Sequence, residues 1–255
     1  MDRILEQYFD FGVMFDPGNF DKVIDGFVFT IKLSIIAGIA SLIWGLILAI
    51  LRQTPGRLSW IVRVPTVAYI DVLRGVPALL TILLVSTSLG ALAATDPLTG
   101  QGSVIPRWLG IPEWFGQPSP FWYGVFAITL TYGAYMAEVY RAGIEAVPGG
   151  QMEAARSLGM SYGKAMRFVI VPQAIRKVIP PLLNDYIALM KDTTLVSVIG
   201  LIEVVQAGRD IQSVEFNSSS LMLGAILFVI VTIPLARIVD WMIARQQAQY
   251  ERGAT

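Results

Sequence analysis

Apolar residues gather along this chain in long runs that are separated by polar stretches. Two runs without a charged residue, Leu33–Leu51 and Val76–Thr95, each reach the length of about 20 residues that a helix needs to cross a bilayer core. Phe121–Ala137 and Leu221–Ala236 are slightly shorter and reach that length if their ends enter the headgroup region. A protein of this size has no soluble core that could bury all of these runs. The pattern therefore predicts an all-α integral membrane protein.

The breaks between the runs predict about five transmembrane helices. The expected helices are Phe27–Leu51, Trp60–Leu92 with kinks at Pro65 and Pro77, Phe121–Tyr140, Ile179–Val205, and Leu221–Ile243 with Pro234 inside it. The Gly- and Pro-rich segment Ala94–Pro120 is expected to be an external loop. This divides the chain into a lead-in (1–25), a transmembrane domain (26–243) and a tail (244–255). The lead-in is either a short interfacial helix or an irregular segment.

Small residues form a stripe along the first predicted helix. Ala37, Ser41, Gly45 and Ala49 recur every fourth residue, which places them on one helix face. Such a stripe lets another helix approach closely. We expect the partner to be a helix of the same chain, with self-association as the alternative.

Basic residues are distributed unevenly between the segments that connect the predicted helices. Twelve fall in segments on one side of the membrane and four on the other, while Lys32, Arg74 and Lys191 lie inside the apolar zone. Basic residues are enriched in cytoplasmic segments. The N-terminus is therefore expected outside and the C-terminus in the cytoplasm, which an odd number of crossings allows.

The composition narrows the chemistry that the chain can perform. Hydrophobic residues make up 55% and charged residues 15%, and the 19 basic and 19 acidic residues balance. Net charge therefore gives no reason to expect a nucleic-acid partner. The chain contains neither His nor Cys, which excludes thiolate nucleophiles and imidazole-based metal or acid–base sites.

The polar segment 141–177 is more patterned than a simple linker. Pro148 and two glycines break the chain, and Gln151–Leu158 is expected to be a short Ala-rich helix. Gly159 can end this helix in a left-handed conformation, and Ser161 can cap the next helix. Two short helices at an angle can lie in a groove on a partner protein.

The run Glu153-Ala154-Ala155, followed by Gly159 and Val169-x-Val171-Pro172, resembles the EAA loop of bacterial ABC importer permeases. The stretches Leu73–Leu80, Tyr135–Gly159 and Pro172–Leu195, together with Glu203, are similar to the polar amino-acid branch of that family. These are the permeases of histidine, glutamine, arginine and glutamate importers, and the resemblance extends from about Gly26 to the C-terminus.

The resemblance implies a type I ABC importer fold, a place in the bacterial inner membrane among lipids, and three protein partners. These are an ATPase subunit dimer, a second permease chain that is identical or paralogous, and an extracytoplasmic solute-binding protein. The EAA loop would contact the ATPase through Glu153, Ala154, Ala155, Arg156 and Gly159.

No nucleotide site is expected in this chain. The phosphate-binding loop of many ATPases requires G-x-x-x-x-G-K-[ST]. Gly159–Ala165 reads GMSYGKA, which lacks one spacer residue and has Ala in place of the hydroxyl. ATP and Mg²⁺ are therefore assigned to the partner ATPase, and no cofactor or metal to this chain. A membrane enzyme is disfavoured because no nucleophile–base pair or metal cluster is evident. A self-sufficient channel or secondary transporter remains the other alternative.

Ionisable residues at membrane depth cost about 2.5–3.5 kcal/mol each on insertion scales, so they are candidate functional residues. Asp71 and Arg74 can pair with each other, and Glu138 is expected to pair with Arg141. The segment that follows Met190 brings two charges and two hydroxyls together near the midplane. The predicted substrate pathway consists of Lys191, Asp192, Thr193, Thr194, Asn184 and Arg74. Alternatively, Lys191 and Asp192 pair with each other or with Asp185 and only hold the helix together.

Overall fold

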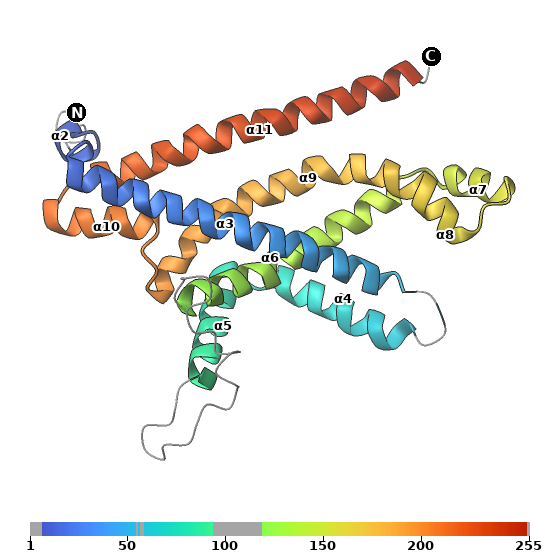
Figure 1. Ribbon diagram of the computed structural model, residues 1–255, viewed down its shortest axis with the longest axis horizontal. Coiled ribbons are helices and arrows are strands. Elements are labelled where there is room, and N and C mark those ends of the chain that lie inside the picture. Colours follow the sequence, from blue (N-terminus) through green and yellow to red (C-terminus); the bar gives the residue numbers. More distant parts are fainter. Residues whose placement is uncertain (1–6, 55, 57–58, 94–118, 254–255) are drawn as a thin grey trace.

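The computed structural model describes residues 7–54, 56, 59–93 and 119–253, and this part of the chain is helical with no strand (Figure 1). The helices are α2 (Phe11–Met14), α3 (Pro17–Arg52), α4 (Ser59–Gly75), α5 (Ala78–Ala93), α6 (Ser119–Glu145), α7 (Gly149–Ser157), α8 (Tyr162–Ala165), α9 (Val171–Asp192), α10 (Val204–Glu215) and α11 (Ser219–Gly253). A π-helical turn, η1 (Met166–Ile170), joins α8 to α9, and a 3₁₀ helix, η2 (Thr193–Ile199), follows α9. The predicted external loop lies outside the described residues as far as residue 118.

Helix α3 begins earlier than the apolar run indicates. Its N-cap is Asp16, whose Oδ1 accepts hydrogen bonds from the backbone N–H of Gly18 at 3.0 Å and of Asn19 at 3.3 Å. Pro17 occupies the first helical position, where its missing N–H costs nothing. The predicted start at Phe27 is therefore wrong, because the charged residues before it continue the helix beyond its apolar part. The C-terminal end, at Arg52, lies one residue beyond the predicted Leu51.

The small-residue stripe of α3 packs within the chain. Ala37, Ser41, Gly45 and Ala49 are all buried. A Cβ atom on Gly45 would lie 2.8 Å from Cβ of Met136 and 2.9 Å from the carbonyl oxygen of Gly133, both on α6. Helix α6 thus approaches the backbone of α3 directly, and the expected intramolecular packing is confirmed.

The second predicted helix is two helices. Helices α4 and α5 meet at a bend of 111°, whereas the sequence predicts a kink at Pro77. Proline disfavours α-helical dihedrals at the residue before it and supplies no N–H of its own, so Val76 and Pro77 end one helix and start the next. Pro65 lies inside α4. Tyr69 attaches α4 to α3 and α6, because its hydroxyl accepts from Trp44 Nε1 and donates to the carbonyl of Leu130, both at 2.9 Å.

The fourth predicted helix starts earlier and ends earlier than expected. Helix α9 runs from Val171 only to Asp192 and continues as η2, in which Thr193, Thr194 and Ser197 donate their hydroxyls to carbonyls three residues back. Gly200 then turns the chain with a φ of 84°. Helix α10 was not predicted. It is capped by the carboxylate of Glu203, which accepts from two backbone N–H groups at 2.8 Å and is fully buried.

Two of the described helices are long and apolar enough to cross a membrane alone, α3 and the Ser219–Ala248 part of α11. The bent pair α4–α5 provides a third if it counts as one span. Helices α6 and α9 correspond to predicted crossings, but neither is long and apolar enough to be counted with these spans. Both pack against neighbouring helices on several sides, so much of their polar surface is shielded from lipid.

Short helices lie at opposite ends of the long axis of the molecule (Figure 1). Helices α7 and α8 and the C-terminal end of α11 lie toward one end, and α2 and α10 toward the other. At the second end, the backbone N–H of Ser218 donates to the carbonyl of Gln7 at 2.8 Å, and that of Asp10 donates to Ser219 Oγ at 2.8 Å. The lead-in therefore contains a short helix, α2, and is fastened to the start of α11.

Replacing Gly45 by Ala places a methyl group against the backbone of α6, and we expect it to destabilise the protein by about 2 kcal/mol because of overpacking. Gly90→Ala is the matched control, since nothing lies within 4 Å of a Cβ atom there. That change should be neutral or stabilising, because Ala in a helix interior is about 1 kcal/mol more favourable than Gly. Thermal unfolding of the purified chain in detergent measures both, and equal melting temperatures would contradict the packing described.

Candidate solute pocket and coupling segment

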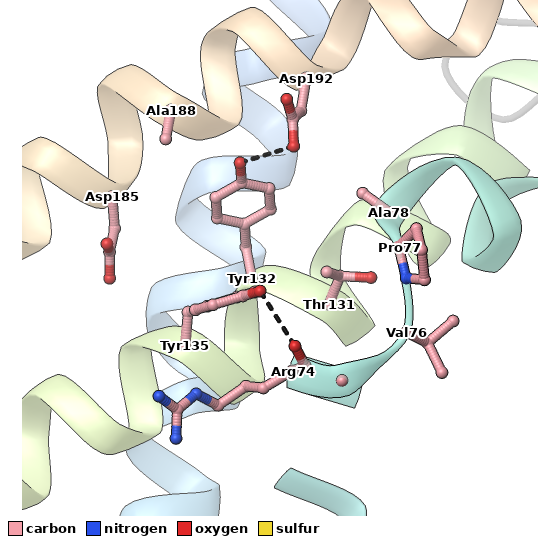
Figure 2. A pocket seen from close by; sticks show the side chains of 11 residues that line it. Arg74, Val76, Pro77, Ala78, Thr131, Tyr132, Tyr135, Asp185, Ala188 and Asp192 are labelled. Atoms are coloured by element: carbon pink, nitrogen blue, oxygen red, sulfur yellow. Dashed lines mark hydrogen bonds between the residues drawn. The ribbon is translucent and has the colours of Figure 1, made fainter. Parts of the chain in front are cut away.

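A polar cavity of about 420 Å³ lies between α6, α9 and the bend that joins α4 to α5 (Figure 2). The lining residues come from these elements and are Arg74, Gly75, Val76, Pro77, Ala78, Thr131, Tyr132, Tyr135, Asp185, Ala188 and Asp192. We call this cavity the solute pocket. The bend between α4 and α5 places Val76, Pro77 and Ala78 in its wall.

Tyr132 connects two walls of the solute pocket. Figure 2 shows its side chain reaching from α6 to α9, where its hydroxyl donates a hydrogen bond of 2.9 Å to Oδ2 of Asp192. The ring of Tyr132 is largely buried in the main hydrophobic cluster. Asp192 is therefore held in place by a neutral donor, and its charge is not cancelled by that contact.

Arg74 provides the guanidinium group of the pocket. Its guanidinium carbon lies 5.7 Å from the centroid of the Tyr135 ring, and the Tyr135 hydroxyl donates to the backbone carbonyl of Arg74 at 3.2 Å. Tyr135 thus positions the C-terminal end of α4 through both contacts. Among the described residues, no ion pair joins Arg74 to Asp71, so that suggested pair is absent.

Two buried polar atoms of the pocket have no hydrogen-bond partner among the described residues. They are Oδ2 of Asp185 and Oγ1 of Thr131. Buried polar atoms in native proteins are nearly always hydrogen-bonded, so each exception calls for an explanation. Both atoms belong to residues that line the same cavity, where a polar ligand can reach them.

The structure brings together only part of the predicted substrate pathway. Arg74 and Asp192 line the solute pocket. Lys191 and Thr194 line a second, more apolar cavity of about 440 Å³ beside α10 and α11. Thr193 is fully buried and donates to the Met190 carbonyl at 2.6 Å, and Asn184 is exposed and lines neither cavity.

The alternative, in which Lys191 forms a structural ion pair with a neighbouring aspartate, is not observed. No ion pair of the described residues joins Lys191 to Asp192 or to Asp185. Tyr132, Tyr135 and Thr131 were missed as pocket residues. The spacing of the three on one helix face was the available signal, but an aromatic face is more often core than site.

A second charged cluster lies near the end of α6. Glu138 forms ion pairs of 2.5 Å with Arg141 on the same helix and with Arg52 at the end of α3. Arg141 also pairs with Glu145. The expected Glu138–Arg141 pair is confirmed, and Arg52 extends it into a contact that joins α3 to α6.

The segment after α6 adopts the predicted pair of short helices. Helix α7 ends at Ser157, and Gly159, the residue after its C-cap Leu158, has a φ of +81°. The backbone N–H of Met160 donates to the carbonyl of Ala155 and that of Gly159 to the carbonyl of Arg156, which is the hydrogen-bond pattern of a Schellman motif. Ser161 Oγ then accepts from the N–H of Lys164 at 3.4 Å and caps α8. The predicted left-handed turn and cap are confirmed.

Helix α7 presents one face to the protein and leaves the other open. Ala155 is buried, and Met152 packs on the cluster formed by Val147, Ile170 and Ala174. The remaining residues proposed to contact the ATPase (Glu153, Ala154, Arg156 and Gly159) are exposed. Helix α7 thus packs on η1 and the start of α9 on one side and is open to a partner on the other.

Comparison with known proteins decides the family. The family described as a binding-protein-dependent transport system inner membrane component matches residues 41–249. The probable glutamine ABC transporter permease protein GlnM of Bacillus subtilis is 32% identical over 93% of this chain and 98% of that protein. The arginine transport system permease protein ArtQ of the same organism is 31% identical over 83% of this chain and 86% of its own length. This chain belongs to that family of permeases.

Solved structures support the same family assignment. The crystal structure of an amino acid ABC transporter with histidines matches the permease with a TM-score of 0.72 at 32% identity, over 88% of this chain and 94% of that chain. An inward-facing structure of the methionine ABC transporter MetNI matches with a TM-score of 0.64 at 16% identity, over 87% and 96% of the two chains, which shows a likeness of fold. The expected all-α fold of a type I ABC importer permease and the resemblance to amino-acid permeases are confirmed.

Neutralising Asp185 tests whether the permease tolerates an unpaired charge in its pocket. Asp185→Asn should stabilise the ligand-free protein by about 1 kcal/mol, because Oδ2 of Asp185 is buried without a hydrogen bond and a carboxylate costs more to bury in that state than a neutral amide. Asp71→Asn is the control, since Asp71 is exposed and outside the pocket. Melting temperatures in detergent measure both. A lower melting temperature for Asp185→Asn would mean that this carboxylate already has a partner that stabilises its charge.

Proposed function

We propose that this permease forms the membrane pathway of an ATP-driven importer for a polar amino acid and that the solute passes through the solute pocket. The observation that carries the proposal is the set of charges in that pocket, with the carboxylates of Asp185 and Asp192 and the guanidinium of Arg74 around one cavity. An amino acid brings one ammonium and one carboxylate. Each finds a group of opposite charge there, and the relatives named for glutamine and arginine transport support this solute class.

The unpaired polar atoms support the same assignment. A solute that hydrogen-bonds to Asp185 and Thr131 would satisfy groups that the protein alone leaves unpaired. Sites of this kind in transporters commonly use interrupted helices, whose free backbone groups face the ligand. The α4–α5 bend and the transition from α9 to η2 are two such interruptions, and the bend borders the pocket.

The proposed machine contains several subunits. Two permease chains, identical or paralogous, enclose one pathway about a two-fold axis. An ATPase dimer binds ATP and Mg²⁺, so this chain carries no cofactor and performs no hydrolysis. A solute-binding protein delivers the amino acid from outside.

Helix α7 is the element proposed to receive the motion of the ATPase. Through Met152, its inner face packs on the cluster that contains Ile170 of η1 and Ala174 of α9. Helix α9 carries Asp185 and Asp192 farther along the same axis. A displacement of α7 is therefore transmitted along α9 to one wall of the solute pocket.

The orientation follows from the positions of basic residues relative to the two ends of the fold. The end that contains α7 also holds Arg156, Lys164 and Arg167. We assign this end to the cytoplasm by the enrichment of basic residues there. The N-terminal segment and α10 then lie outside, and the C-terminus lies in the cytoplasm.

The pocket assignment is tested by transport into proteoliposomes that contain the permease with its ATPase subunit, supplied with the solute-binding protein. Asp192→Asn should reduce uptake at least tenfold, because the ammonium of the solute loses its charged partner. Stimulation of ATP hydrolysis by the loaded binding protein should persist. The amount of folded protein should also persist, since an Asn oxygen can still accept from Tyr132 and no ion pair with Lys191 is broken.

Two further variants make this result specific. Asn184→Ala is the matched control on α9, outside the pocket, and should transport at a rate close to the wild type. Glu153→Lys should instead abolish both uptake and stimulated hydrolysis, because it reverses a charge on the exposed face of α7. Unchanged uptake by Asp192→Asn would refute the pocket assignment, and unchanged hydrolysis by Glu153→Lys would refute the role of α7.

Single cysteines test the orientation, because the chain contains none of its own. Cysteine in place of Ser213, which is exposed on α10, should react with a membrane-impermeant maleimide in intact cells. Cysteine in place of Ser157 or Gln247, exposed on α7 and α11, should react only after permeabilisation. Labelling of the Ser157 variant from outside would reverse the orientation and remove the argument for ATPase contact.

A further inference from the structure

A third cavity, of about 370 Å³, lies between α9 and α11, away from the solute pocket. Its lining consists of Arg176, Ile179, Trp241, Met242, Arg245 and Gln246. Gln246 fastens the two helices together here, because its Nε2 donates to the backbone carbonyl of Arg176 at 2.5 Å. We call this cavity the basic pocket.

Both arginines of the basic pocket carry a charge that no acidic side chain in the described part of the chain balances. Among the described residues, neither Arg176 nor Arg245 forms an ion pair. Arg237, two turns before Arg245 on α11, differs in this respect, since it pairs with Asp240 at 3.5 Å. Two guanidinium groups that share a cavity repel each other unless an anion lies between them. The basic pocket therefore has the charge of an anion site.

The other walls of the basic pocket are apolar. The guanidinium carbon of Arg245 lies 5.3 Å from the centroid of the Trp241 ring, which orients this side chain by a cation–π contact. Trp241 and Ile179 are exposed, and Met242 is partly buried. A small hydrated anion gains nothing from such walls, whereas a phosphate with attached acyl chains covers them.

The depth of the basic pocket points to the same ligand. Trp241 and Arg245 lie toward the C-terminal end of the apolar part of α11, and Arg176 lies in the second turn of α9. Tryptophan is enriched at the boundary between membrane and water. With the orientation proposed above, this boundary faces the cytoplasmic leaflet, where basic pockets between transmembrane helices bind the headgroups of anionic lipids.

We infer that the basic pocket binds the phosphodiester headgroup of an anionic phospholipid of the cytoplasmic leaflet. Arg176 and Arg245 hold the phosphate, for which the planar donor fork of arginine is suited. Ile179, Met242 and Trp241 cover the first part of the acyl chains. The bound lipid joins α11 to α9, the helix that links α7 to the solute pocket.

The test uses the purified full chain in phosphatidylcholine-containing micelles, to which phosphatidylglycerol is added. Native mass spectrometry measures the affinity for phosphatidylglycerol, and thermal unfolding measures the stabilisation that it gives. A basic residue near an anionic lipid surface is worth about 1 kcal/mol, or about fivefold in affinity. Arg176→Gln and Arg245→Gln should each weaken phosphatidylglycerol binding about fivefold, and the double variant about 30-fold.

Arg237→Gln is the matched control, because Arg237 lies on α11 outside the basic pocket and has an acidic partner. It should bind phosphatidylglycerol like the wild type. All variants should have wild-type melting temperatures in phosphatidylcholine alone, which separates lost lipid binding from misfolding. The single variants provide the same comparison if the double variant proves unstable.

Three results would overturn the inference. Equal phosphatidylglycerol binding by the wild type and the double variant would place the lipid elsewhere. Equal stabilisation by inorganic phosphate would assign the basic pocket to a soluble anion. Normal lipid binding together with loss of the ATPase subunit from the double variant would make the two arginines a protein contact.

Discussion

The close approach of α3 to α6 is the contact on which the rest of the permease depends. Gly45 leaves room for the backbone of α6. Side chains of α3 before and after Gly45 extend this interface. Trp44, one residue earlier, donates to Tyr69 and so brings α4 onto the same interface. Arg52, two turns later, pairs with Glu138. Because α6 also carries Thr131, Tyr132 and Tyr135, the position of the solute pocket is set by this packing.

The pocket combines one strong internal contact with several groups that have no partner. The hydrogen bond between Tyr132 and Asp192 joins α6 to α9 across the cavity. Asp185 and Thr131, by contrast, each have a buried oxygen atom without a hydrogen-bond partner in the described part of the chain. Such groups lower the stability of the ligand-free protein, and natural proteins retain costs of this kind mainly where function needs them. Within the pocket, the Tyr132–Asp192 contact supports the fold, and Asp185 and Thr131 are the groups proposed to meet a solute. Three other buried hydroxyls of the described residues without a hydrogen-bond partner, those of Ser41, Thr81 and Ser220, lie outside the pocket lining.

Sequence reasoning located most of the helices but few of their ends. Long apolar runs identify α3, α6 and α11, because burial in lipid or core requires apolar side chains over the whole length. The 111° bend at Pro77 was expected only as a kink, since a proline restricts the residue before it without fixing the direction of the chain. Helix α10 was missed because its cap is Glu203, a residue that ordinarily favours helix interiors. The turn at Gly159 was predictable because few residues other than glycine adopt its φ.

The solute pocket was only partly predictable, for a geometrical reason. Lys191 and Asp192 are adjacent in sequence, but successive residues of a helix point about 100° apart. Asp192 therefore faces α6 and the solute pocket, whereas Lys191 faces the cavity beside α10 and α11. Separation of these two charges leaves two carboxylates and one guanidinium in the solute pocket. In the role proposed for this pocket, the two carboxylates would face the ammonium of an amino acid, and Arg74 at the α4–α5 bend would face its carboxylate.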